Sequence, residues 1–298
     1  MLRSTAVIDG IDDGELARLV RRQQLLPLQR GAYLTGALPD EHARHRAVVT
    51  ATVAGLRAGG VIAHASAAVL HRLPLWRVPV QRVHLIRPPG SAGSRSSRLH
   101  LHLARVAADE ITVVAGVQVT DVTRTVVDLA RTVPFESAVV TADAALHGGA
   151  TTREQLTEGL ARMGAVPGAR RAARVIAFAD GLSESVGESR SRVVFQQLGV
   201  PTPQLQRRVL RPDGTLIGRC DFGWDGFGTV GEFDGRVKYG RLLRPGQSTP
   251  DAVYDEKLRE DEIRDHGWQM VRWTWPELGR PTVVGDRLQR AFRRGRRP

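Results

Sequence analysis

The chain of 298 residues is long enough for two domains, each with a substantial hydrophobic core. Its 42% hydrophobic and 25% charged residues are typical of a globular protein, and no apolar run approaches the roughly 18 residues of a membrane span. The net charge of +12 favours association with polyanions such as nucleic acid, and the single cysteine, Cys220, excludes intramolecular disulfides and cysteine-based zinc sites.

The start of the chain predicts a cytoplasmic protein. Residues 1–14 contain three aspartates and no apolar segment of the length that a signal peptide requires. A lone cysteine also suits a reducing cytosol. We therefore expect a cytoplasmic location and no membrane partner.

The basic excess is unevenly distributed along the chain. Residues 1–181 contain 22 basic and 15 acidic residues (+7), residues 182–280 contain 15 of each, and residues 281–298 contain six basic residues and one acidic residue (+5). This pattern is expected if flanking parts hold nucleic acid while acidic groups gather around a metal. The arginine-rich segment 281–298 also has the composition that is typical of a disordered, solubilising tail.

The first elements predicted are a helix and a hairpin. From Glu15 onward, apolar residues at positions 16, 19, 20, 25 and 26 favour one face of a short helix with arginines on the other face. Residues 27–34 then predict two short strands around Gly31. A helix followed by a hairpin is the back half of a winged helix-turn-helix, whose helix enters the major groove of DNA. Few residues precede it, so we expect a partial winged-helix-like module over residues 1–38.

Residues 39–181 predict a mixed α/β domain. Helices are expected at 42–58 and 123–131, and β-rich runs lie at 83–86 and 99–103. Eight of the nine histidines fall in this region, and five of them are the candidates for a shared site: His64, His71, His84, His100 and His102. A metal site would need three of them to converge, and the sequence offers no acidic partner at a fixed spacing. We therefore expect these histidines to lie on the surface or to line a groove.

Several runs resemble the AbiEi-type antitoxin-related proteins. They are Arg30-Gly-Ala-Tyr, His64-Ala-Ser-Ala-Ala with His71-Arg-Leu-Pro-Leu, Val119-Thr-Asp-Val-Thr-Arg-Thr-Val-Val-Asp-Leu-Ala, and Asp143-Ala-Ala-Leu. The resemblance covers about residues 15–160. It implies a winged helix and an α/β domain that bind DNA and repress an operon, with a cognate toxin or other protein as a partner. Within these runs, Ser66 and Thr123-Arg124-Thr125 suit helix caps and packing better than direct contacts.

Residues 182–280 predict a second domain of different texture. A capped start at Ser183 leads into an amphipathic helix that ends near Gly199. A hairpin over residues 206–222 turns at Pro212-Asp-Gly-Thr, and a strand follows at 229–234. A charged helix at about 252–266 and a strand at 269–274 complete an αβββαβ order. The fold class is thus α+β and multi-domain.

This order resembles the core of the PD-(D/E)xK nucleases, the restriction-endonuclease-like fold. The resemblance implies a divalent cation gripped by carboxylates on two adjacent strands, with a nearby lysine that positions the attacking water. Asp221 lies eleven residues before Glu232, a separation that lets neighbouring antiparallel strands place both carboxylates at one end of the sheet. Glu232 and Asp234 share a strand face, and three such charges repel one another unless a cation lies among them. We expect Mg²⁺ or Mn²⁺ at this site.

Other residues complete the expected site. Glu188, on the preceding helix, is placed like the additional acid of many such sites. The position of the motif lysine is Asp234, and similar proteins of the very-short-patch-repair endonuclease-like group also have Glu-x-Asp-Gly there. The chain's two lysines, Lys238 and Lys257, both follow the acidic cluster, and Lys238 is the preferred candidate for the catalytic ammonium.

The expected function is therefore a DNA-binding protein with a metal-dependent endonuclease domain that hydrolyses phosphodiester bonds. The alternative is a non-enzymatic DNA-binding transcriptional regulator or antitoxin of a type IV toxin-antitoxin-like system. In that case the nuclease-like domain would be retained only as a binding platform, with its acids and lysines in surface ion pairs.

Overall fold

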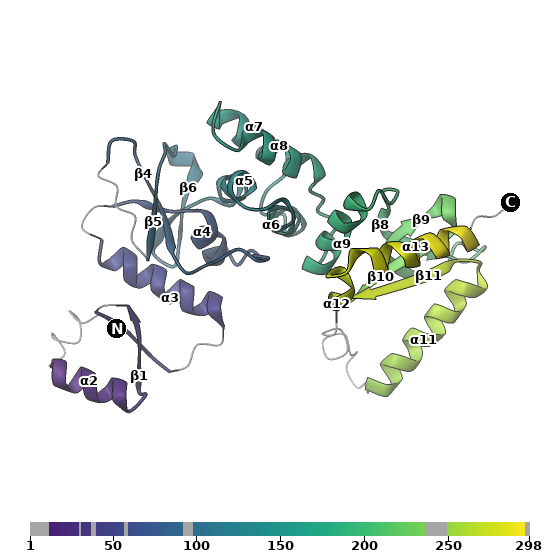
Figure 1. Ribbon diagram of the computed structural model, residues 1–298, viewed down its shortest axis with the longest axis horizontal. Coiled ribbons are helices and arrows are strands. Elements are labelled where there is room, and N and C mark those ends of the chain that lie inside the picture. Colours follow the sequence, from purple (N-terminus) through teal and green to yellow (C-terminus); the bar gives the residue numbers. More distant parts are fainter. Residues whose placement is uncertain are drawn as a thin grey trace. The chain divides into compact units, whose positions relative to one another are not determined.

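The computed structural model describes residues 12–29, 31–36, 40–56, 59–91, 98–235 and 249–295 (Figure 1). The chain divides into two compact units, residues 1–179 and 180–298, and this division falls within two residues of the expected boundary at 181. Each unit combines helices with β-sheet, which confirms the α+β, multi-domain fold class. None of the described helices is long and apolar enough to cross a membrane.

The first unit begins with the predicted helix and hairpin. Helix α2 (Asp13–Arg21) is capped by Asp12, whose carboxylate accepts a hydrogen bond from the Glu15 amide at 2.7 Å. Strands β1 (Leu25–Gln29) and β2 (Ala32–Thr35) pair antiparallel around Gly31, which has a positive φ of 76°. Leu16 and Leu25 form a small core between helix and hairpin.

A five-stranded sheet forms the centre of this unit, in the order β5-β4-β3-β7-β6. Its strands are β3 (Val61–Ile62), β4 (Val83–Arg87), β5 (Leu99–Leu103), β6 (Ile111–Val114) and β7 (Val117–Thr120). Strands β4 and β5 are parallel, and their register sets His84 opposite His100 and Ile86 opposite His102. Because side chains alternate along a strand, these histidines share one face of the sheet.

Helices surround this sheet. Helices α3 (Glu41–Ala54) and α5 (Val122–Thr132) correspond to the two predicted helices, although α3 ends four residues early. Sequence patterns did not single out α4 (His64–Leu70), α6 (Phe135–His147), α7 (Arg153–Met163) or α8 (Ala169–Phe178). Helix α5 packs against α4, α6, α7 and α8, and it is therefore the central helix of the unit.

The second unit has the predicted order of helix, three strands, helix and strand. The elements are α9 (Val186–Gln197), β8 (Gln204–Leu210), β9 (Leu216–Trp224), β10 (Thr229–Asp234), α11 (Thr249–Asp265) and β11 (Gln269–Thr274). The sheet order is β11-β10-β9-β8, with β10 and β11 parallel and the other pairs antiparallel. A short helix, α12 (Trp275–Leu278), follows the last strand.

Two separate hydrophobic clusters cover the two faces of this sheet. The larger contains Phe195 of α9 with aromatic residues of the strands, including Phe222 and Trp273. The smaller contains Ile263 of α11 with Cys220 and Val230. The sheet is thus enclosed between α9 on one side and α11 on the other, which buries the middle of β10 on both faces.

Residues 281–295, expected to belong to a basic tail, form helix α13 (Pro281–Gly295). Its apolar side chains pack into the larger cluster: Val284, Leu288, Ala291 and Phe292. They recur at helical spacing, and the surrounding arginines obscure this pattern in the sequence. Arg290, Arg293 and Arg294 point away from the core and are exposed.

The close approach of α9 to β10 gives a test of this packing. A Cβ added at Gly187 would lie 2.0 Å from Cε1 of Phe233, whose ring meets Trp275 edge-on with centroids 4.8 Å apart. Gly187→Ala should therefore lower the free energy of unfolding of the second unit by about 1–3 kcal/mol through overpacking. Denaturation followed by tryptophan fluorescence measures this, because four of the five tryptophans lie in that unit.

Gly226→Ala is the matched control, because a Cβ there would meet no atom within 4 Å. We expect it to change the free energy of unfolding far less than Gly187→Ala. Equal effects of the two substitutions would show that the Phe233 ring has room to move.

Candidate functional site

Asp221 lies on β9 beside β10, as the sequence predicts. Its carboxylate oxygen Oδ2 accepts a hydrogen bond from the backbone amide of Phe233 at 2.8 Å. Phe233 is the residue between Glu232 and Asp234, so this bond fixes Asp221 next to the expected acidic pair. Asp221 and Asp234 are half-buried, and Asp234 is the last residue of β10.

Glu188 is almost fully buried near the start of α9 and is held by three donors. Its carboxylate accepts hydrogen bonds from the Ser185 hydroxyl at 2.7 Å, the Glu184 amide at 3.0 Å and Nε2 of Gln206 at 2.9 Å. Gln206 has a positive φ of 52°, and the pairing of β8 with β9 is interrupted at this residue. Glu188 therefore links the helix to a distorted point of the sheet, opposite the stretch of β9 that carries Asp221.

Glu232 is 8% exposed and lies between two guanidinium groups. Arg259 of α11 contacts its carboxylate at 2.7 Å, and Arg272 of β11 contacts it at 3.1 Å. Both arginines also pair with Glu256. Burial acts to lower the pKa of Arg259, but its ion pairs with Glu256 and Glu232 outweigh burial and raise it, so the guanidinium stays charged.

Among the described residues, the cations that contact Glu232 are arginines and do not include the expected Lys257. Lys257 is exposed on α11, and the residue of that helix that contacts Glu232 is Arg259. Lys238 lies outside the described residues. The charge of Glu232 also reaches the neighbouring Cys220: burial, reinforced by this carboxylate, raises the pKa of that thiol to about 12, so Cys220 is not a nucleophile at neutral pH.

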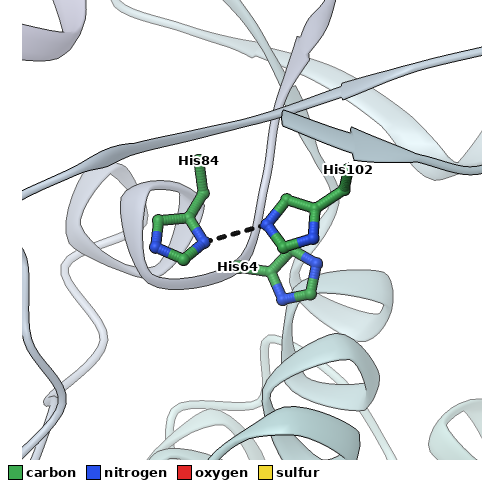
Figure 2. A group of neighbouring side chains, drawn as sticks. All are labelled: His64, His84 and His102. Atoms are coloured by element: carbon green, nitrogen blue, oxygen red, sulfur yellow. Dashed lines mark hydrogen bonds between the residues drawn. The ribbon is translucent and has the colours of Figure 1, made fainter. Parts of the chain in front are cut away.

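The acidic residues do not form a compact metal-binding group. Histidine, cysteine, aspartate and glutamate side chains can all bind metal ions. Within the described part of the chain, one group of three of them lies close enough together to hold an ion, and it contains no carboxylate. It consists of His64, His84 and His102, whose candidate ligand atoms all lie within 4.8 Å of one another (Figure 2).

This histidine group was missed by the sequence analysis. The alternation Leu99-His-Leu-His-Leu places His100 and His102 on one strand face, but the parallel partner strand, which adds His84, could not be identified from spacing. His64 comes from the start of α4 and is buried, whereas His71 makes a hydrogen bond to the Thr120 carbonyl at 2.7 Å elsewhere. The expectation that these histidines lie on the surface or line a groove is confirmed for His64, His100 and His102, which line a pocket, and His64 is buried there.

A pocket of about 480 Å³ opens beside these histidines. Its lining includes His64, His100 and His102 together with Arg124, Asp128 and Arg131 of α5. Arg124 contacts Glu110 at 2.8 Å and Asp128 at 2.9 Å, and Arg131 contacts Asp128 at 3.0 Å. The expected packing role of Arg124 is confirmed, since it is buried in this network. Burial, opposed by both arginines, raises the pKa of Asp128.

Comparison with known proteins gives relatives without a stated activity. No family model matches the chain. Over 173 residues, 58% of this chain, it is 27% identical to an uncharacterised protein of Mycobacterium tuberculosis strain CDC 1551 and to an uncharacterised protein of strain H37Rv. The match covers 60% of each of these proteins, so the chain spans about three fifths of the length of the curated relatives it matches.

The scaffold of the histidine pocket should respond to acid through His45. This side chain of α3 is buried, and its Nε2 lies 2.8 Å from the Ser66 hydroxyl. Burial, helped by His42 and opposed by a hydrogen bond with the Val80 backbone, lowers the pKa of His45 from 6.5 to about 4. The folded protein therefore keeps His45 neutral while the unfolded chain takes up a proton below pH 6.5.

The stability that neutral His45 contributes is fully present above pH 6.5 and is lost as the pH falls toward 4. The loss amounts to at most about 1.4 kcal/mol for each pH unit. Hydrogen exchange followed by mass spectrometry on peptides of the first unit measures it. His45→Gln keeps a polar atom near Ser66 and should flatten the pH dependence. An unchanged dependence in this variant would assign the acid sensitivity to other groups.

Proposed function

We propose that this protein binds DNA and that its second unit hydrolyses phosphodiester bonds as a metal-dependent endonuclease. The observation that carries the proposal is the placement of Asp221 against the Phe233 amide, between Glu232 and Asp234. Carboxylates on two adjacent interior strands of a mixed sheet, β9 and β10, are thereby held near one another along the chain direction. Oxygen ligands of this kind suit Mg²⁺ and Mn²⁺.

Asp221, Glu232 and Asp234 do not form a compact metal-binding group in this structure, so in this proposal they would have to move closer together to hold the cation. The cation would polarise the scissile phosphate and lower the pKa of a bound water. Glu188, with both oxygens hydrogen-bonded, would act as a positioning residue that fixes α9 to β8 beside Asp221. Its hydrogen bonds support this role better than the ligand role expected from the sequence.

Arg259 and Arg272 would have two roles at this site. Without a cation they neutralise Glu232, whose buried charge would otherwise be costly. If a bound divalent cation neutralised Glu232 instead, the guanidinium groups could turn toward phosphate oxygens, which they bind in a bidentate geometry. Lys257 and Lys238 remain the candidates for an ammonium that positions water.

A second candidate function is a non-enzymatic DNA-binding regulator or antitoxin. The observation that favours it is the same pair of arginines, because their contacts complete the surroundings of Glu232 with protein groups alone. The resemblance of residues 15–160 to AbiEi-type proteins agrees with this candidate, and a toxin or other protein would then be the partner. Metal binding separates the two candidates.

Metal binding and cleavage should depend on the acidic residues of β9 and β10. With DNA present, calorimetry should detect Mn²⁺ binding by the full chain, and Mg²⁺ or Mn²⁺ should support DNA cleavage that EDTA abolishes. Glu232→Gln and Asp221→Asn each remove one ligand charge, so both should lose metal affinity and cleavage. DNA affinity should stay intact or rise slightly, because less negative charge opposes the phosphates.

Asp261→Asn is the matched control, since Asp261 is an exposed acid on α11 of the same unit. It should keep wild-type metal affinity and cleavage. If the wild type binds no Mn²⁺ in the presence of DNA, or binds it no better than Glu232→Gln does, the endonuclease proposal fails and the regulator is preferred.

DNA binding should involve the exposed arginines of α13. Replacing Arg290, Arg293 and Arg294 by glutamine should weaken binding to duplex DNA at low salt. The slope of log affinity against log salt should become shallower by about 0.9 for each phosphate contact that is lost. Fluorescence anisotropy over a series of salt concentrations measures both quantities, and the apolar face of α13 stays unchanged.

The control removes the same charge from the first unit by replacing Arg170, Arg171 and Arg174 of α8, which are also exposed. An equal loss in both triple variants would assign the effect to net charge alone. An unchanged slope in the α13 variant would exclude this helix from the DNA contact.

A further inference from the structure

Three imidazole rings converge in the first unit from separate elements. His84 lies on β4, His102 on β5 and His64 at the start of α4. Nδ1 of His84 and Nε2 of His102 are 3.0 Å apart, and the His64 ring stacks on His102 with centroids 3.8 Å apart (Figure 2). The parallel register of β4 and β5 creates the first pair, and the turn into α4 adds the third ring.

We propose that His64, His84 and His102 form a binding site for a divalent transition metal ion, Zn²⁺ by preference, with one coordination position open toward the adjacent pocket. The proposal concerns the first unit and does not depend on the endonuclease activity proposed for the second.

The distances are close to those that a zinc ion requires. Zinc binds imidazole nitrogen at about 2.0–2.1 Å in tetrahedral geometry, which places the ligand nitrogens about 3.3 Å from one another. The nitrogens of His84 and His102 need to separate by only a few tenths of an ångström. The candidate ligand atom of His64 lies within 4.8 Å of both, and side-chain rotation has to shorten this distance and turn the His64 ring out of its stacked position on His102.

The protonation state also suits a metal, because only neutral imidazole is a ligand. Burial, reinforced by His102 and His100, lowers the pKa of His84 to about 3. Burial and the same neighbours, with His84, also lower the pKa of His64. These rings are therefore neutral at physiological pH, and metal binding needs only a change of tautomer, in which the proton between Nδ1 of His84 and Nε2 of His102 moves to the other nitrogen of its ring.

Neighbouring side chains fix the backbone at His84 and contact the ring of His64. The Ser66 hydroxyl accepts a hydrogen bond from the His84 amide at 2.9 Å and contacts His45 at 2.8 Å, which fixes this stretch of β4 against α4. Nδ1 of His64 lies 3.4 Å from the Thr132 hydroxyl, which leaves Nε2 as its ligand nitrogen. Such outer contacts select the tautomer of a metal-binding histidine.

The backbone conformation of His64 also supports the proposed metal site. This residue has a positive φ of 51° although it is not glycine. A side chain held in this region costs free energy, and such strain concentrates at functional sites. Here it turns the imidazole at the start of α4 toward the two strand histidines.

The composition of the site decides which metal it prefers. The carboxylate among the pocket-lining residues, Asp128, has its two oxygens held by Arg124 and Arg131. The site therefore offers nitrogen ligands, which suit Zn²⁺ and related transition metals and not Mg²⁺, a cation that prefers oxygen.

The pocket supplies the open position. His64 and His102 line it, and three protein ligands leave one tetrahedral position for water or a small ligand. Zinc sites that act on a bound molecule have three protein ligands and an accessible fourth position, whereas structural zinc sites have four protein ligands.

The test uses the untagged full chain, freed of metal by a chelator and titrated with Zn²⁺ against a chromophoric zinc indicator. We expect one Zn²⁺ per chain, and a thermal unfolding temperature that rises on Zn²⁺ addition. The double variant His84→Asn with His102→Gln keeps polar atoms near the lost nitrogens and should weaken binding more than about 100-fold. Mg²⁺ should not compete.

Two controls locate the ion. His147→Gln removes an exposed histidine at the end of α6, and Asp261→Asn removes an exposed acid of the second unit, so both should keep wild-type Zn²⁺ affinity. In case the double variant does not fold, wild-type protein with Co²⁺ provides a second measurement, since tetrahedral Co²⁺ gives intense visible absorption. Absence of stoichiometric binding, an octahedral Co²⁺ spectrum, or unchanged affinity in a folded double variant would overturn the proposal.

Discussion

Glu232 lies almost buried between Arg259 and Arg272, and this balance of charge governs the second unit. A carboxylate in such a place is stable only if positive charge compensates it. The two guanidinium groups come from α11 and β11, which flank β10, so the ion pairs also tie the helix and the last strand to the strand that carries the acid. Neutralisation of one side chain on an interior strand thus connects three elements of the unit.

The first unit accommodates its buried titratable groups differently, because its buried histidines are uncharged. Its buried histidines avoid charge, because burial and mutual repulsion lower the pKa of His64 and His84. Asp128, a buried carboxylate that lines the pocket, is held by Arg124 and Arg131. The second unit thus keeps a buried carboxylate compensated by arginines, whereas the first unit keeps its buried imidazoles neutral.

Local signals predicted the elements whose pattern is self-contained. The turn at Asp213-Gly214, with a positive φ of 84° at the glycine, marked the β8–β9 hairpin, and the spacing of Asp221 and Glu232 predicted neighbouring strands. Contacts between distant residues could not be predicted. Arg272 reaches Glu232 because β10 and β11 pair in parallel. His84 meets His102 because β4 and β5 also pair in parallel. Helix α13 was missed because its arginines outweighed the apolar spacing of Val284 and Leu288.

The charge balance around Glu232 is the same for an enzyme and for a regulator. Arg259 and Arg272 compensate the buried acid without a cation, so the folded state loses no stability when no metal is bound. A guanidinium is protonated at all physiological pH values and cannot exchange a proton with water in a catalytic cycle. These arginines thus support the fold in both cases, and they neither require hydrolysis nor perform its proton transfer.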